Sequence, residues 1–220
     1  YKDTIFLPKS SFEMRGNLPL KEPKILEQWE KEKIFYKLRE KSKGREKFVL
    51  HDGPPYANGD LHLGHALNKI LKDIICRIKF FNQFDVDYVP GWDCHGLPIE
   101  WKVEEEFKKK GKEKNEVGLD KFRDRCRSFA EYWVREQKTQ FQRFGILTDW
   151  KEIYLTMNKD SEVRIVEELL KFFESGDLYL GFKPVMWSVI EQTALAEAEI
   201  EYHDKVSKSI YVKFPIINRR

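Results

Sequence analysis

Apolar residues recur with helical spacing in several stretches of the chain. After Leu63 they fall at positions 67, 70, 71, 74, 75 and 78, a spacing that predicts one amphipathic helix whose charged residues lie mostly off the apolar face. The same reasoning predicts a helix over residues 22–41, with Pro23 in its first turn, and another that follows Pro98. Two further helices are predicted around residues 122–144 and 163–173, the second ending at Gly176.

Short apolar runs alternate with these helices. Residues 48–50 and 86–89 have the composition of buried strands, and the order strand, loop, helix, strand, loop, helix predicts an α/β fold with a parallel sheet. Beyond Gly181, residues 184–187 and 210–214 are also predicted to be strands. We expect three regions: residues 1–47 with an irregular arm (1–20) and a helix, an α/β region over 48–180, and a β-rich region over 181–220.

Composition narrows the class of protein. The 220 residues are 41% hydrophobic and 14% aromatic, which excludes intrinsic disorder as the main state. Charged residues reach 35%, but 40 Lys and Arg oppose 37 Asp and Glu. The resulting net charge of +3 is too weak to argue by itself for a nucleic-acid partner.

Two features of the sequence indicate the cellular compartment. No apolar run approaches the roughly 18 residues of a membrane helix, and three widely spaced cysteines suit a reducing compartment better than a disulfide framework. We expect a cytoplasmic protein with no membrane partner. Because the chain begins at Tyr1 and stops at Arg220 just after a strand-like run, we also expect a piece that is cut at both ends.

Residues that carry chemistry gather in one window. Residues 51–98 hold five of the 12 glycines, four of the nine prolines and four of the five histidines. Turn-forming residues and side chains that titrate near neutral pH are therefore concentrated together. We expect the functional site in this window.

The first strand-to-helix junction is predicted to bind phosphate. His62 and His65 are three residues apart, so they project from the same side of the first helical turn, and Gly64 leaves room for a ligand to approach the backbone. The free N–H groups of a helix N-terminus attract anions, and imidazoles add donors. Two alternatives remain: the histidines could bind a metal, although no further ligand pattern accompanies them, or they could cap and pack the helix.

The second junction, residues 89–98, carries a candidate for amino-acid binding. Asp93 is a carboxylate in a loop otherwise short of charge, which would suit an ammonium group, and Trp92 could form an aromatic wall beside an aliphatic substrate. Simple loop packing of Trp92 and Pro98 is the alternative. Cys94 and His95 could suggest a thiol nucleophile and its base, but adjacent residues rarely face each other.

These motifs resemble a known family. Residues 51–65, His-Asp-Gly-Pro-Pro-Tyr-Ala-Asn-Gly-Asp-Leu-His-Leu-Gly-His, are similar to the signature of the class I aminoacyl-tRNA synthetases, in particular the isoleucyl type, with residues 62–65 as its HIGH element. The resemblance extends over nearly the whole chain through residues 14–16, 68–75, 88–100, 154–157 and 194–199. It implies the first half of a Rossmann-type parallel-sheet catalytic domain, an N-terminal helical arm, and a β-rich stem that leads to an inserted editing domain.

The resemblance also implies an activity and its residues. The enzyme would activate L-isoleucine with ATP to isoleucyl-adenylate and pyrophosphate, and then transfer isoleucine to the 3′ end of its tRNA. His62 and His65 would be catalytic, and Gly53, Pro54 and Asp93 would bind isoleucine. The ATP-binding residues would be Pro55, Tyr56, Ala57, Asn58, Gly59, Asp60, Leu61, His62, Leu63, Gly64 and His65.

Partners and metals follow from the same resemblance. ATP would enter with Mg²⁺ as substrate, the tRNA would bind mostly through regions outside this chain, and the protein is expected to be a monomer. Some relatives bind zinc through paired cysteines where this chain has Ser188 and Glu191, so no metal is expected within this segment. The family's Lys-Met-Ser-Lys-Ser loop and its anticodon-binding region do not occur in the sequence.

Two other functions are compatible with parts of the pattern. A free-standing nucleotidyltransferase would share the His-x-Gly-His turn, but residues 91–98 argue against it. A binding module that holds ATP or tRNA without turnover is the second alternative. On the synthetase interpretation, the isolated piece carries only one wall of the site, so we expect it to be nearly inactive.

Overall fold

The computed structural model describes residues 2–6 and 15–217 of the chain. Residues 1 and 7–14 of the predicted irregular arm, which include Met14 of its motif, and residues 218–220 lie outside the described residues. The chain divides into two units, Tyr1–Ser175 and Gly176–Arg220. Within the described residues, no helix is long and apolar enough to cross a membrane.

Two helices stand where one was predicted. Helix α1 spans Leu18–Lys31 and α2 spans Ile34–Ser42, after a short 3₁₀ turn at Lys2–Thr4. The single helix over 22–41 is therefore wrong, because Lys33 adopts a left-handed conformation with φ of 54° and interrupts the helical hydrogen bonding. Pro23 lies inside α1, and Pro19 occupies the first turn instead.

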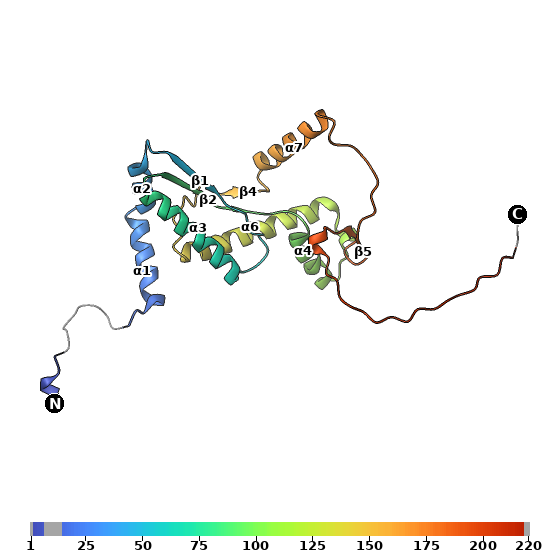
Figure 1. Cartoon of the computed structure of the whole chain (residues 1–220), viewed down its shortest axis with the longest axis horizontal. Coiled ribbons are helices and arrows are strands. Elements are labelled where there is room, and N and C mark those ends of the chain that lie inside the picture. The colour runs from blue at the N-terminus through green and yellow to red at the C-terminus, as the bar shows by residue number, and fades with distance from the viewer. Residues whose placement is uncertain (1, 7–14, 218–220) are drawn as a thin grey trace. The chain divides into compact units, whose positions relative to one another are not determined.

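A parallel pair of strands forms the centre of the first unit. Strand β1 (Lys47–His51) pairs with β2 (Asp85–Val89) in register from Lys47↔Asp85 to His51↔Val89. Helix α3 (Leu63–Phe81) connects them and contacts β2 (Figure 1). Both predicted strands, their parallel pairing and the helix between them are confirmed.

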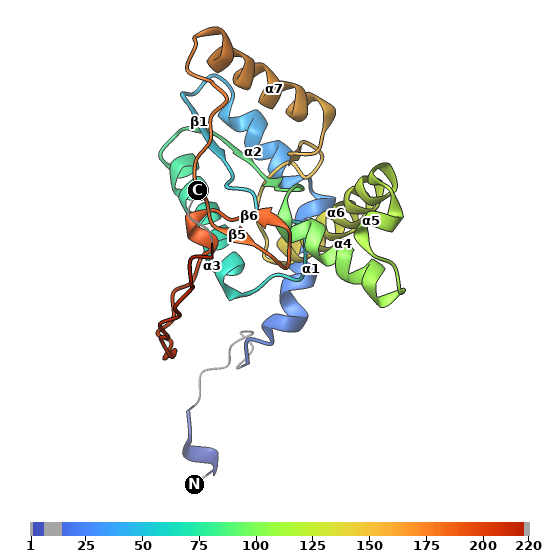
Figure 2. The same cartoon turned by 90° about the vertical axis from the view of Figure 1, so that its right-hand side faces the viewer.

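The remaining helices follow the second strand. Strand β3 (Gly91–Trp92) pairs in parallel with β4 (Tyr154–Leu155), and α4 (Leu97–Lys109) and the short α5 (Lys114–Val117) pack on the long α6 (Leu119–Arg143) (Figure 2). Helix α7 (Lys159–Glu174) ends before Gly176, whose φ is 81°. The predicted helices after Pro98, around 122–144 and up to Gly176 are thus confirmed, the second ending at Arg143.

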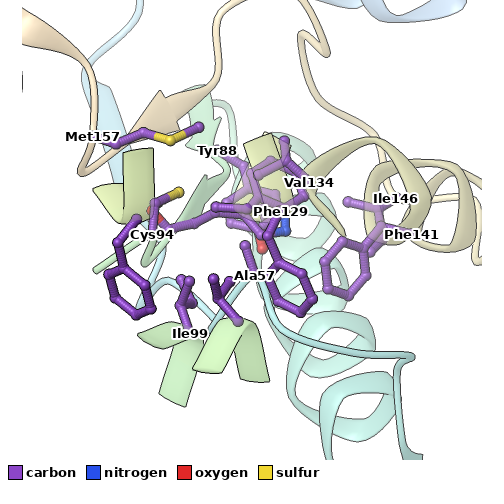
Figure 3. Packing of buried hydrophobic residues seen from close by; sticks show 14 residues of the cluster. Ala57, Tyr88, Cys94, Ile99, Phe129, Val134, Phe141, Ile146 and Met157 are labelled. Carbon is purple, nitrogen blue, oxygen red and sulfur yellow. The ribbon is translucent and has the colours of Figure 1, made fainter. Parts of the chain in front are cut away.

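The core lies where α4 and α6 meet the loops that follow β1 and β2. Trp92, Ile99, Val103 and Ala130 have 1% or less of their surface exposed. Ala57 belongs to the same cluster, with Ile99 and Phe141 nearby (Figure 3). The segments that carry the predicted site are therefore anchored directly in the core.

Helix α3 buries a largely polar face and exposes its apolar face. Its buried residues are Lys69, Asp73 and Cys76, whereas its apolar stripe is exposed in the described structure, at Leu67, Ile70, Leu71, Ile74, Ile75 and Ile78. Asp73 is satisfied by Arg77 Nε at 2.6 Å and by the Leu147 N–H at 2.9 Å. Exposed apolar surface of this extent marks a face that interacts with something else.

The second unit contains less strand than predicted. Strand β5 (Trp187–Ser188) pairs antiparallel with β6 (Thr193–Ala194), and a 3₁₀ turn follows at Glu197–Glu199. The expectation of strands over 184–187 and 210–214, and with it a β-rich region, is wrong for the described residues: 184–186 and 210–214 are not in strands. Alternation alone does not make a strand, because a strand needs a neighbour with which to pair.

We predict that Gly91→Ala destabilises the first unit. A Cβ atom on Gly91 would lie 2.5 Å from Cδ1 and 3.1 Å from the carbonyl oxygen of Tyr154, the residue paired with Gly91 across β3 and β4. Overpacking of this kind costs about 1–3 kcal/mol. Urea denaturation followed by tryptophan fluorescence measures the loss; Gly59→Ala is the control, because no atom lies within 4 Å of its added Cβ. Equal midpoints for the two variants would contradict the prediction.

Candidate functional site

Two loops meet at the carboxyl ends of the parallel strands. We call residues 52–62 the first loop and residues 90–96 the second loop. The Asp93 N–H donates to the Pro55 carbonyl at 2.8 Å, and the Ala57 N–H donates to the Asp93 carbonyl at 2.9 Å, so Tyr56 and Asp93 form a parallel bridge. Backbone bonds therefore hold the two predicted substrate segments side by side.

The two histidines cap helix α3. His62 is the N-cap residue, and its Nδ1 accepts the Gly64 N–H at 3.0 Å, while His65 Nδ1 accepts the His62 N–H at 3.3 Å. The ring centroids are 3.9 Å apart, with the planes tilted by 34°. The capping alternative is thus realised, and it brings both imidazoles to one point.

Capping also decides which nitrogen carries the proton. An Nδ1 atom that accepts a backbone N–H leaves Nε2 as the protonated nitrogen of a neutral imidazole. Partial burial, and then the neighbouring His62, lower the pKa of His65. Both rings therefore present an Nε2–H donor at a helix N-terminus, so capping and phosphate binding are compatible.

Gly64 is required by the position of the His62 ring. A Cβ atom on Gly64 would lie 2.8 Å from Cε1 and 2.9 Å from Nδ1 of His62. Any side chain at position 64 would push the ring away from the hydrogen bond that it accepts. The glycine of the motif thus makes room for the cap as well as for a ligand.

The predicted ATP-binding residues differ in accessibility. Ala57 is fully buried, backbone included, and its N–H donates to the Asp93 carbonyl, so it supports the site from below the surface, whereas Tyr56 is 47% exposed. The exposed members are Tyr56, Asp60, His62, Leu63 and Gly64, and the partly buried ones are Pro55, Asn58, Gly59, Leu61 and His65. All eleven lie in the first loop or the first turn of α3.

Asp93 has a free carboxylate oxygen. Its Oδ1 accepts the His95 N–H at 3.3 Å and the Thr156 hydroxyl at 3.5 Å. Among the described residues, no hydrogen-bond partner is recorded for Oδ2. A half-buried carboxylate that is oriented on one oxygen and open on the other is suited to an ammonium group.

The other candidates of the second loop have structural roles. Trp92 is fully buried, and its indole N–H donates to Gln137 at 2.9 Å, so it packs the core and the aromatic-wall hypothesis is wrong. The Cys94 thiol is buried and donates to the Trp92 carbonyl, and burial raises its pKa to about 11. His95 instead faces Glu162 at 3.3 Å, so no thiol–imidazole pair forms.

A buried ion cluster anchors the start of the first loop. The Asp52 carboxylate is completely buried and pairs with Lys69 and with Lys72, the latter at 2.6 Å. Burial, followed by the nearby charge of Lys72, lowers the pKa of Lys69 to about 7. Gly53, which is exposed, and Pro54, which is half-buried, come directly after Asp52, so this cluster fixes the position at which the predicted isoleucine-binding residues leave the strand.

Sequence reasoning missed residues of α6 and β4 that hold the loops. Gln137 and Gln140 on α6 bond the first loop. The hydroxyl of Thr156, the residue directly after β4, donates to Asp93 Oδ1 and accepts the Cys94 N–H at 2.8 Å. The spacing of the two glutamines by three residues was visible, but polar residues at that spacing usually form a solvated helix face. Only the fold shows that this face is turned inward.

The place predicted to lack zinc lies in the second unit. Ser188 ends β5, and its hydroxyl accepts the Glu191 N–H at 3.2 Å within the turn to β6. Among the residues that the structure describes, no group of three or more His, Cys, Asp or Glu side chains could hold a metal ion. The three cysteines, at positions 76, 94 and 126, are free thiols.

The chain is similar to known proteins along almost all its length. It is 57% identical over 222 residues to the isoleucine–tRNA ligase of Caulobacter vibrioides, covering 99% of this chain and 23% of that protein. The isoleucine–tRNA ligase of Pelagibacter ubique is also 57% identical, over 98% of this chain and 24% of that protein. The chain therefore spans about a quarter of the length of these curated relatives.

A solved structure and a family model agree on the fold. The agnB2 LeuRS–tRNA–LeuAMS ternary complex of Agrobacterium radiobacter K84 superposes with a TM-score of 0.62 at 22% identity, covering 83% of this chain and 21% of that chain. The model of the tRNA synthetases class I (I, L, M and V) matches residues 24–214. The parallel strands, the capped helix and these matches lead to one conclusion: the chain belongs to the class I tRNA synthetases.

Proposed function

We propose that this chain is the part of an isoleucine–tRNA ligase that holds ATP and isoleucine side by side. The observation that carries the proposal is the backbone bridge between the first and second loops, which places Asp93 next to the loop that leads to the α3 N-terminus. The curated relatives are isoleucine–tRNA ligases. Their similarity favours this function over a free-standing nucleotidyltransferase.

The first chemical step needs positioning rather than a base. An oxygen of the isoleucine carboxylate attacks the α-phosphorus of ATP, the new oxygen–phosphorus bond forms, and the bond to the pyrophosphate oxygen breaks. The attacking group is already ionised, so no proton has to be removed. Neutral imidazole donors, a helix N-terminus and a carboxylate that fixes the ammonium group are the parts that such a reaction requires.

The residues take their roles from this geometry. Asp93 Oδ2 would receive the ammonium of isoleucine, with Gly53 and Pro54 beside it, and residues 55–65 would carry the nucleotide. The Nε2–H groups of His62 and His65 would stabilise the charge that moves onto pyrophosphate. Magnesium would enter with ATP, and no residue of this chain is assigned to it. Transfer to the 3′ end of the tRNA would follow, mostly through parts of the ligase outside this chain.

We further propose that β1, α3 and β2 form the first half of a Rossmann-type domain, and that residues 181–220 form the stem of an editing insertion. Among the described residues, β1 has no neighbour on its second edge, and the apolar face of α3 is exposed. A parallel sheet is normally covered on both faces, so both features support a domain that is completed by further chain.

We expect the full-length enzyme to catalyse isoleucine-dependent exchange of pyrophosphate into ATP. Isoleucine should be used in preference to valine, because one methylene in a hydrophobic pocket contributes about 1–3 kcal/mol to recognition. The rate of exchange with each amino acid is the measurement. The 220-residue chain alone should be nearly inactive. Stronger activation of valine or leucine than of isoleucine would refute the assigned specificity.

His65→Ala should slow adenylate formation by about 10²–10³-fold, the cost of losing one transition-state donor. Single-turnover formation of isoleucyl-adenylate gives the rate directly. His203→Ala is the matched control, because His203 is exposed in the second unit and pairs with Glu201 at 3.3 Å. An unchanged rate in His65→Ala would remove His65 from the mechanism.

Asp93→Asn should weaken isoleucine binding by about ten- to a hundredfold, as expected when a hydrogen bond to a charged group is lost. The affinity for ATP should stay the same, because the backbone bridge to the first loop does not use the Asp93 side chain. Calorimetric titration with each substrate separates the two effects. Asp120→Asn, at an exposed position of α6, is the control; an equal loss of both affinities in Asp93→Asn would indicate misfolding instead.

A further inference from the structure

Helix α6 packs against both loops, and the side chains of two of its glutamines form hydrogen bonds with them. Gln137 is 1% exposed, in the middle of a helix whose other buried residues are apolar. Gln140 lies on the same face, one turn later, and is partly buried. Buried amides require partners, and the partners of this pair all lie in the first and second loops.

Gln137 joins the second loop to the first. Its Oε1 accepts the Trp92 indole N–H at 2.9 Å, and its Nε2 donates to the carbonyls of Tyr56 at 3.0 Å and Gly59 at 2.7 Å. The orientation of the amide is fixed by chemistry, because an indole N–H can only donate and carbonyl oxygens can only accept. Both N–H groups of the side chain are therefore committed to the loop that precedes the HIGH element.

Gln140 repeats the arrangement closer to the histidines. Its Oε1 accepts the Leu61 N–H at 3.1 Å, and its Nε2 donates to Asp60 Oδ1 at 2.9 Å. Leu61 is the residue immediately before the His62 cap. The pair Gln137 and Gln140, here called the α6 amide pair, thus bonds the first loop at residues 56, 59, 60 and 61.

The need to pair buried polar groups in the core does not explain this pattern of hydrogen bonds. The Trp92 indole needs one acceptor, which any buried oxygen could supply. The four remaining bonds of the amide pair go to the first loop, an irregular segment in which, apart from the bridge between Tyr56 and Asp93, residues 56–61 belong to no strand or helix. A loop that must present donors to a ligand needs such external bonds to hold one conformation.

We propose that Gln137 and Gln140 are positioning residues that fix the first loop for ATP. The inference rests on the proposed function, in which this loop carries the nucleotide. The amide pair acts on ATP binding and not directly on isoleucine, because the Asp93 carboxylate is oriented by Thr156 and by the His95 N–H rather than by α6.

Gln137→Glu in the full-length enzyme tests the proposal. The substitution keeps the shape and the acceptor for Trp92, but it replaces two N–H donors with an oxygen facing two carbonyls. The carbonyls of Tyr56 and Gly59 then lose their donors, which destabilises the observed conformation of the first loop. The Kd for ATP should rise by about ten- to a hundredfold. The Kd for isoleucine should be unchanged. Calorimetry of ATP binding without amino acid is the readout, so it does not depend on which amino acid the enzyme activates.

Two further variants keep the test decisive. Gln140→Met, at a partly exposed position, removes the bonds to Asp60 and Leu61 and should also raise the Kd for ATP. This variant provides the test if Gln137→Glu fails to fold. Gln142→Met makes the same change at an exposed position of α6 and should alter nothing. Unchanged ATP affinity in folded Gln137→Glu, or in Gln140→Met if the former unfolds, overturns the inference. Equal weakening of ATP binding and isoleucine binding also overturns the inference. Absence of isoleucine-dependent pyrophosphate exchange in the unmodified enzyme overturns only the proposed function.

Discussion

Strands β1 and β2 are parallel and in register, so both end at the same edge, at His51 and Val89. The chain after each strand then has to leave from the same place, and the Asp93 backbone completes the pairing with Pro55 and Ala57. Everything that the candidate site contains depends on this common edge. An antiparallel pair would have put the two loops at opposite ends of the sheet.

Charge inside the protein secures this arrangement. Asp52, the first residue beyond β1, is buried between Lys69 and Lys72 of α3, so the beginning of the first loop is tied to the helix at its end. A buried carboxylate is tolerated only when it is paired. The helix therefore turns a polar face inward, and its apolar face remains exposed in the described structure.

The sequence predicted the strands, the helices and the histidine turn, because each has a local signature. Spacing defines an amphipathic helix, and the His-x-Gly-His turn lies between a strand and a helix. Prediction from the sequence failed where the outcome depends on contacts that a local pattern does not specify. Lys33 breaks a helix without being glycine or proline, residues 210–214 alternate but have no strand partner, and the inward orientation of the α3 charges depends on Asp52, 17 residues away from Lys69.

The sequence by itself determined the family resemblance, the parallel α/β order and the position of the capped helix, since these follow from residue type and spacing along the chain. Only the tertiary structure decided how the loops are held. Trp92 became a core residue because Gln137, 45 residues later, accepts its indole N–H, and both glutamines of α6 became part of the site because the helix packs behind the first loop. Hydrogen bonds between distant segments depend on direction in space, which periodicity along a chain does not encode.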